Sequence, residues 1–346
     1  PSKILFVAGL FLGLSFSSMI IYALQYGGLK KAIQLAILIH GGEQIESGPY
    51  VFTKHFIGLC YVSFFLIILA ILAEGWKQNF ALKAALGLLS FLGVILTTLL
   101  IAARGSLLWL FIALYLVLFI YKQKLYLPYL VALIFFGIVF ISVGKPFFHI
   151  LYRKEPLTQI FNLFHNFNYV SYYQTLWREF AHPYISLEGA LATTEEFTPR
   201  IFLDLIYAVL YLIPERLIPV QFPETVQYLN TEIVMGIRES VVPPGLLAFL
   251  WYSALLPGVV LGGVAYGAMG RCLETILSRN KKNPLGLGLY ILAGFMWSYV
   301  FIRNGEPRVI LFGQLPWLIL FFCVFTTSRW YIRKQRCRSS QEYIRL

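Results

Sequence analysis

Long apolar stretches separated by short polar segments are the dominant pattern of this chain. A helix needs about 20 apolar residues to cross the hydrocarbon core of a bilayer. A chain that is 59% hydrophobic and only 13% charged over 346 residues fits a set of such helices. The pattern predicts eight membrane-spanning helices, at 4–24, 55–73, 82–101, 106–121, 127–144, 245–268, 285–302 and 309–327. We therefore expect an all-α polytopic membrane protein with about eight transmembrane helices.

One long segment, residues 145–244, interrupts the series of apolar stretches. We expect it to form a single large loop on one side of the membrane. It separates three other parts: a five-span N-terminal bundle at 1–144, a three-span C-terminal bundle at 245–327, and a basic tail at 328–346. The chain begins at Pro1 inside an apolar stretch, so we expect further residues, and further spans, to precede it.

Two shorter apolar segments lie outside the spans. Residues 29–39 have apolar positions at helical spacing, which predicts a short helix that lies at the interface or packs on the bundle. Residues 200–213 are too few to cross a bilayer and stop at Pro214, which predicts a re-entrant or interfacial helix. Asp204 follows Arg200 by four residues there, so an ion pair between them is at least as probable as a catalytic role.

The distribution of charge predicts the orientation. With the N-terminus in the cytoplasm, the cytoplasmic segments contain 15 of the 28 Lys and Arg residues but only three of the 16 acids. The longer outer segments are neutral, which is the arrangement that the positive-inside rule predicts. The basic tail is then a stop-transfer segment and an anchor on anionic lipid, and nucleic acid is not an expected partner.

Motifs for several classes of chemistry are missing from the sequence. There is no Walker loop, GxGxxG, HExxH or GxSxG elbow, so nucleotide-driven chemistry is not expected. The four cysteines are scattered, without ligand spacing, and predict neither a disulfide framework nor a metal site. We expect no cofactor.

Arginines at the outer ends of the spans are the main candidates for binding. Arg forms bidentate hydrogen bonds to phosphate and stays charged, so a ring of outer arginines suits a phosphate-bearing, lipid-attached substrate. Each arginine alone is equally well explained as a headgroup anchor or a salt-bridge partner. The candidates are Arg104, Arg178, Arg200, Arg216, Arg238, Arg303 and Arg308.

The order of features resembles the Wzy-type O-antigen and capsular repeat-unit polymerases, which are related to the O-antigen ligases. The resemblance rests on several short motifs spread over the chain: Tyr26-Gly27-Gly28, Ala103-Arg104-Gly105-Ser106, the single large loop, Thr198-Pro199-Arg200, the proline-rich 213–223, Val241-Val242-Pro243-Pro244-Gly245, and a last outer turn with Arg303. Arg178 and Gly189 also match the Arg-x10-Gly arrangement described for some members.

The resemblance implies a GT-C-like membrane glycosyltransferase that acts outside the bacterial cytoplasmic membrane. Its substrates would be undecaprenyl-diphosphate-linked oligosaccharide repeat units, its partner a chain-length-regulating co-polymerase, and it would use neither metal nor nucleotide sugar. Cations must surround the leaving diphosphate, and a base must stand near the incoming hydroxyl. The candidates for the base are His182, Glu239 and Asp204, and the sequence does not choose among them.

Two other functions stay open. An O-antigen ligase would share the spans and the outer loop but would transfer finished chains to a lipid A core. A transporter or flippase would also be polytopic, and it should have ionisable groups at mid-span or broken helices. Pro257 interrupts one expected span, although proline is common in membrane helices.

Overall fold

The computed structural model describes residues 2–40, 50–102, 104–153, 169–210, 223–236, 242–278 and 284–324, and these segments are helices joined by turns. Six helices are long and apolar enough to cross a membrane, or up to seven if one bent pair counts as a single span. The chain is therefore a multi-pass, all-helical membrane protein, as the sequence predicts. The six are Lys3–Gln25, Lys54–Glu74, Phe80–Ile101, Gly105–Lys122, Gly245–Ser278 and Pro284–Asn304.

Two of the eight expected spans are not among these six, although one of them lies within a single long helix. The one expected at 127–144 lies within α7 (Leu127–Arg153), of which Leu127–Gly137 is recognised as a shorter apolar helix. The one expected at 309–327 is two helices, α15 (Pro307–Gly313) and Leu315–Val324, bent by 70°. The bend makes this segment a broken span or a re-entrant loop.

Helix α4 (Leu59–Glu74) is the centre of the bundle. It packs against α1 (Ser2–Gln25), α5 (Phe80–Ile101), α6 (Arg104–Lys122) and α13 (Pro284–Phe295). Its side chains at Leu59, Val62 and Phe65 are fully buried. Helix α5 approaches α4 closely because Gly93 has no side chain, and a Cβ there would overlap the sulfur of Cys60. Close helix contact through a small residue is the usual way in which membrane helices associate.

Several buried polar side chains of the bundle pair with groups on neighbouring helices. The hydroxyls of Tyr61 and Thr98 are 2.8 Å apart, and Ser63 donates to the carbonyl of Ala8 at 2.8 Å. Lys83, at the start of α5, is fully buried and pairs with Glu74 of α4 at 3.0 Å. An unpaired charge is costly away from water, so the two residues stay together. The pair thereby links the end of α4 to the start of α5, at the end of the bundle where the N-terminus lies.

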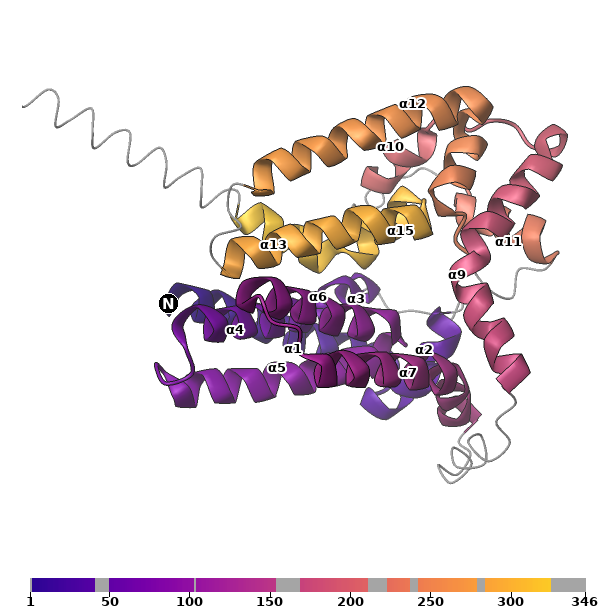
Figure 1. Ribbon diagram of the computed structural model, residues 1–346. Coiled ribbons are helices and arrows are strands. Elements are labelled where there is room, and N and C mark those ends of the chain that lie inside the picture. The colour runs from indigo at the N-terminus through magenta and orange to yellow at the C-terminus, as the bar shows by residue number, and fades with distance from the viewer. Residues whose placement is uncertain are drawn as a thin grey trace, which may run out of the picture.

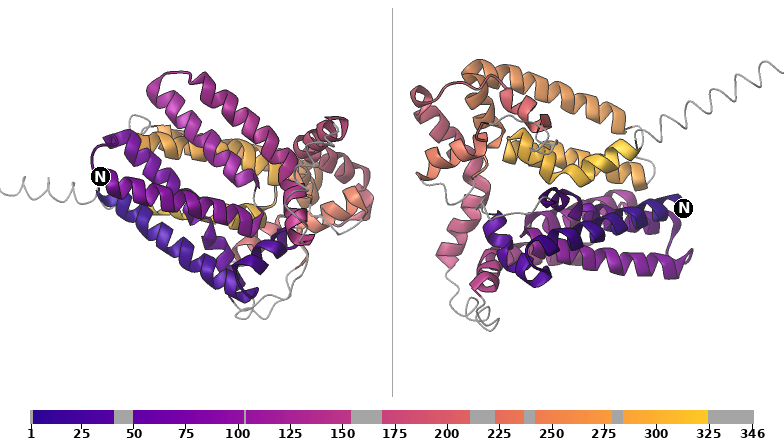
Figure 2. Two further views of the ribbon diagram at one scale, coloured as in Figure 1. Left: turned by 90° about the horizontal axis from the view of Figure 1, so that it is seen from below. Right: turned by 180° about the vertical axis from the view of Figure 1, so that it is seen from behind.

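The other end of the bundle carries a layer of helices that run across it. Figure 1 shows α9 (Tyr169–Ala192), α11 (Val226–Met235) and the first part of α12 (Gly245–Ser278) at the end opposite the N-terminus, and Figure 2 shows the same separation from two further sides. Helix α2 (Leu29–His40) lies at this end too, against α5 and α7. The short helix expected at 29–39 is thus confirmed, as one that packs on the bundle.

Helix α12 is broken near its beginning, and the bend is visible in Figure 1. Ala254 and Leu255 have non-helical backbone angles, and Pro257 follows. Gly258 and Gly262 have no side chains to keep the second part of the helix away from Leu250 in the first part. The first nine residues therefore belong to the outer layer, and the rest of α12 runs along the bundle.

The break leaves two carbonyl oxygens of α12 without donors from within the helix. A segment that is distant in sequence supplies the two N–H donors. Pro257 has no N–H to give to the carbonyl of Ser253 four residues earlier. The N–H of Ile201 donates to this carbonyl at 2.7 Å, and the N–H of Arg200 donates to the carbonyl of Tyr252 at 3.1 Å. The segment before α10 (Leu203–Leu210) is thereby fixed to the break in α12.

Candidate functional site

The turn between α14 (Ile302–Asn304) and α15 is the centre of the candidate site. Before it, α13 continues into a π-helical turn, η4 (Met296–Phe301). Gly305 in the turn lies directly against the backbone of Gly245, where α12 begins, and Gly245 in turn lies against Pro183 of α9. Both glycines have positive φ, +68° and +72°, which a side chain would disfavour. Three helices distant in sequence meet at this turn.

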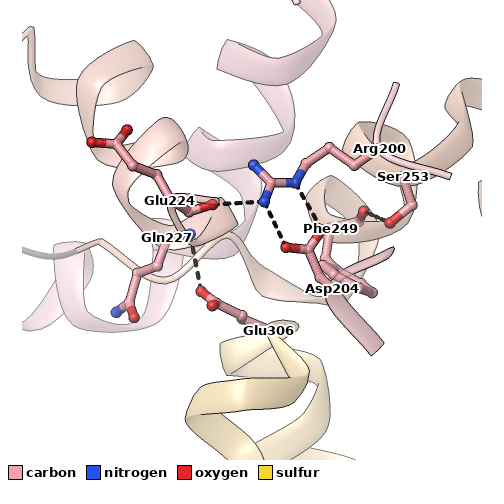
Figure 3. A network of polar contacts seen from close by, with 7 residues as sticks. All are labelled: Arg200, Asp204, Glu224, Gln227, Phe249, Ser253 and Glu306. Atoms are coloured by element: carbon pink, nitrogen blue, oxygen red, sulfur yellow. Dashed lines mark hydrogen bonds and ion pairs between the residues drawn. The ribbon is translucent and has the colours of Figure 1, made fainter. Parts of the chain in front are cut away.

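Glu306 is buried at this junction, with 1% of its surface exposed. Its Oε2 accepts a hydrogen bond from the backbone N–H of Gln227 at 2.9 Å, as Figure 3 shows. Gln227 is in the first turn of α11, where backbone N–H groups lack helical partners, so the carboxylate caps that helix. Glu306 thus joins α15 to the outer layer.

Burial raises the pKa of Glu306 from 4.5 to about 7. The hydrogen bond from Gln227 opposes this shift, the nearby carboxylate of Asp204 adds to it, and Arg308 and Arg200 oppose it. A carboxyl group with this pKa changes its charge near neutral pH, unlike an ordinary surface glutamate.

Arg200 and Asp204 form a bidentate ion pair. Nε and Nη2 of Arg200 donate to the two carboxylate oxygens of Asp204, each at 2.8 Å, and Nη2 also donates to the carbonyl of Glu224 at 2.6 Å (Figure 3). The predicted ion pair is confirmed. Arg200 does not lie on the same helix as expected, because α10 begins only at Leu203, after a turn in which Ile201 and Phe202 have positive φ. Residues 211–213 and Pro214 lie outside the described residues.

Arg303 lies near Tyr299 of η4 and His182 of α9. Its guanidinium carbon is 5.8 Å from the centre of the Tyr299 ring, and its backbone carbonyl is 3.3 Å from Nε2 of His182. A carbonyl only accepts hydrogen bonds, so in this contact Nε2 of His182 carries the proton. The Tyr299 ring packs against the ring of Trp109 of α6, at 4.1 Å between ring centres and an angle of 48° between the ring planes. Arg303 and His182 therefore lie beside the end of α6 that carries Arg104.

Arg308 faces α3 (Lys54–Ile57). Its charge acts on both Lys54 and His55, and the His55 ring packs on Phe312, one helical turn after Arg308, at 4.3 Å between ring centres. Arg303 and Arg308 thus point to different neighbours although only four residues separate them.

The side chains of several expected site residues lie outside the described part of the chain. Arg104 is the first residue of α6 and Arg178 lies within α9, but their side chains are outside the described part. Arg216, Arg238 and Glu239 lie outside the described residues altogether. Of the expected residues whose side chains are described, Arg200 and Asp204 come together near Glu306, His182 contacts the carbonyl of Arg303, and Arg308 lies near His55.

Sequence reasoning missed Glu306 and Lys54. The only signal for Glu306 in the sequence is its position directly before a proline, in a short turn between two arginines. A solvent-exposed glutamate would be equally ordinary in such a turn. Its burial depends on α11, which no local pattern connects to this turn. Among the described residues, no three His, Cys, Asp or Glu side chains lie where they could hold one metal ion.

The arrangement offers cations for an anionic group and an imidazole for a proton, at one end of an apolar bundle. No protein-family model, curated protein or solved structure matches this chain, so its function is inferred from its own residues.

Proposed function

We propose that this protein polymerises lipid-linked oligosaccharide repeat units, for O-antigen, capsule or exopolysaccharide, by glycosyl transfer from undecaprenyl diphosphate. The observation that carries the proposal is the contact between His182 of α9 and the carbonyl of Arg303, in the turn that joins α14 to α15 at the end of the bundle opposite the N-terminus. A membrane enzyme that handles a lipid diphosphate needs cations at headgroup depth, next to the apolar phase that holds the isoprenoid tail.

The chemistry divides between the arginine and the histidine. A hydroxyl of one repeat unit attacks the anomeric carbon of the other chain, and its proton passes to a base. The bond from the anomeric carbon to the diphosphate oxygen breaks, and undecaprenyl diphosphate leaves with the electron pair. Arg303 stabilises the charge that grows on the diphosphate, as Arg104 and the other outer arginines would if they line the same surface. His182, whose ring the carbonyl of Arg303 orients through Nε2, accepts the proton.

Asp204 is a poorer base than His182. Both of its oxygens accept hydrogen bonds from Arg200, and it is buried. Its carboxylate is therefore engaged within the protein. Asp204 is better described as a structural partner of Arg200, and Glu239 remains an untested candidate outside the described residues.

The proposal includes a location and an orientation. The chain belongs in the bacterial cytoplasmic membrane with about eight spans, its two ends in the cytoplasm, and its large loop on the periplasmic or outer side. The excess of Lys and Arg in the segments at the N-terminal end of the bundle supports this orientation. The partners are undecaprenyl-diphosphate-linked oligosaccharide, membrane lipid and a chain-length-regulating co-polymerase.

The break in α12 bears on the alternative of a transporter. In transporters, carbonyls freed by a broken helix bind the ion or the substrate. Here the carbonyls of Tyr252 and Ser253 already accept hydrogen bonds from Arg200 and Ile201. The break therefore supports a fixed outer layer better than an ion site, and the transporter or flippase is the weaker alternative.

Polysaccharide ladders test the proposed reaction. In cells that lack the native protein, Arg303→Ala should remove the long chains, Arg303→Lys should restore them only in part because Lys binds phosphate through one point, and His182→Ala should reduce them. Arg271→Ala, which changes an exposed arginine of α12 at the other end of the bundle, is the matched control and should leave the ladder intact. Null cells should carry single repeats on their lipid A core. Cores without any repeat would support a ligase, and full ladders from Arg303→Ala would refute the proposal.

A further inference from the structure

The exposed face of α10 is entirely apolar. Every exposed residue between 201 and 210 has an aliphatic side chain, and the only charged residue of this stretch, Asp204, is buried. A helix that lies on a water-facing surface normally carries polar residues on its exposed side. Contact with water is therefore unfavourable for this face. The exposed side chains, 45–74% accessible, are Ile201, Leu203, Leu205, Ile206 and Val209.

The neighbouring helices of the outer layer have a different surface. Helix α9 exposes Glu188 in its second half, and α11 exposes Glu232. Acidic side chains are almost always found in contact with water, so these two helices suit an aqueous surface. The apolar exposed face is thus a property of α10 and not of the whole outer layer.

The backbone at the start of α10 is hydrogen-bonded within the protein. The N–H groups of Arg200 and Ile201 donate to carbonyls at the break in α12. Those of Leu203 and Leu205 donate to the carbonyls of residues 200 and 202, both at 3.0 Å. Hydrocarbon offers no water to a backbone N–H, which therefore needs a partner inside the protein. These contacts make the start of α10 compatible with lipid.

The opposite face of α10 packs on protein. Helix α10 contacts α15, and its buried residues are Asp204 and Ala208, one helical turn apart. On this side the carboxylate of Asp204 is paired with Arg200. An ionisable residue at membrane depth is tolerated when it faces protein and has a partner. Helix α10 therefore has one face suited to protein and one suited to lipid.

A lipid-facing surface adjoins α10. In the second part of α12, which belongs to a membrane-spanning helix, Leu256, Val260 and Val264 follow at four-residue spacing, and each is more than half exposed. Ile201 is hydrogen-bonded to Ser253, three residues before Leu256, so the two apolar surfaces begin at the same place. Figure 1 shows α10 on the bundle side of the break in α12. The exposed face of α10 continues the lipid-facing surface of α12.

We propose that α10 is inserted into the membrane leaflet at this end of the bundle, and that Leu205, Ile206 and Val209 contact the acyl chains of bilayer lipids. With eight residues, α10 is too short to cross the bilayer, so it anchors the outer layer to the membrane without spanning it. The inference is independent of the proposed function. A second copy of the chain is the other occupant that suits such a face, and the test separates it from lipid.

Photolabelling of the native protein tests this contact. The protein is placed in nanodiscs, one copy per disc, with a phospholipid that carries a diazirine in the middle of its acyl chain. After irradiation, the adducts are mapped by mass spectrometry. Helix α10 should be labelled to within about threefold of residues 256–264 of α12, because both contact hydrocarbon. The segments around Glu188 and Glu232 are the matched controls and should be labelled about tenfold less.

Reaction of cysteine variants with a water-soluble maleimide gives an independent measurement. In nanodiscs, Ile206→Cys should react about tenfold more slowly than Glu188→Cys, and the two should react alike in the unfolded protein. Fast reaction at position 206, or a lack of lipid adducts on α10, would overturn the inference, because the face would then lie in water. Adducts that form in single-copy discs but disappear in liposomes at high protein density would also overturn it, because a second copy would then cover the face.

Discussion

Gly305 contacts the backbone of Gly245 so closely that a Cβ on Gly305 would overlap the carbonyl oxygen of Gly245. Both residues have positive φ, and each begins or precedes a helix of the candidate site. The contact fixes where α12 starts relative to Arg303 and Glu306.

Gly305→Ala should destabilise the outer layer. The left-handed backbone alone costs about 1–2 kcal/mol for a residue with a side chain, and the overlap with Gly245 adds to this cost. Thermal unfolding in detergent should show a lower melting temperature and faster proteolysis of the outer segments. Gly313→Ala is the control, since no heavy atom lies within 4 Å of its Cβ position. Equal melting temperatures for the two variants would show that the contact is not tight.

Asp204→Asn should lower stability without abolishing the reaction. The amide loses the charge-assisted bidentate contact with Arg200, at a cost of about 2–3 kcal/mol. Since Asp204 is a structural partner and not the base, the rate per folded protein should stay within a few-fold, and the pH profile should not move. A folded Asp204→Asn protein that makes no polymer would reassign Asp204 as the base.

The buried pair at the other end of the bundle should behave as a unit. Lys83→Met leaves the carboxylate of Glu74, 13% exposed, without its cation, and should cost about 3–5 kcal/mol. The double variant Lys83→Met, Glu74→Gln should recover most of this loss because no buried charge is left. Unfolding measured for both single variants and for the double variant gives the coupling. Additive losses would mean that the two groups act independently.

Stability should depend on pH through Glu306. Its folded pKa of about 7 is above the ordinary 4.5, so the folded protein holds the proton over a range in which the unfolded chain has lost it. The stability that this proton adds is complete below about pH 4.5 and is lost as the pH rises through about 7, with a total near 3 kcal/mol. Melting temperatures measured across this range should fall with rising pH, and Glu306→Gln should remove that part of the dependence. A Gln variant with the same slope would place the titrating group elsewhere.

The long helices were predictable from the sequence, and the bends were not. Six spans follow directly from apolar length, because a helix that crosses lipid has no other way to satisfy its backbone. The break at Ala254 and Leu255 depends on donors from Arg200 and Ile201, about 50 residues earlier, so Pro257 alone does not locate it. The 70° bend after α15 falls at Gln314, two residues before Pro316, but the hydropathy pattern runs through it.

The candidate site was predictable in kind but not in arrangement. Charge distribution and the outer arginines pointed to Arg303 and Arg308, and helical spacing pointed to the ion pair of Arg200 with Asp204. The burial of Glu306 and the approach of Lys54 to Arg308 arise from contacts between segments that are far apart in sequence. Such contacts leave no periodic pattern, and only the folded chain reveals them.

Lengthening of a purified substrate tests the central proposal most directly. The protein, reconstituted in liposomes with undecaprenyl-diphosphate-linked repeat units, should yield a ladder of longer lipid-linked chains and free undecaprenyl diphosphate, with a chelator present and with no nucleotide sugar. Arg303→Ala protein of equal folded content should yield only the starting unit. If the original protein leaves the units unchanged, or lengthens them only when a nucleotide sugar is added, it is not the polymerase proposed here.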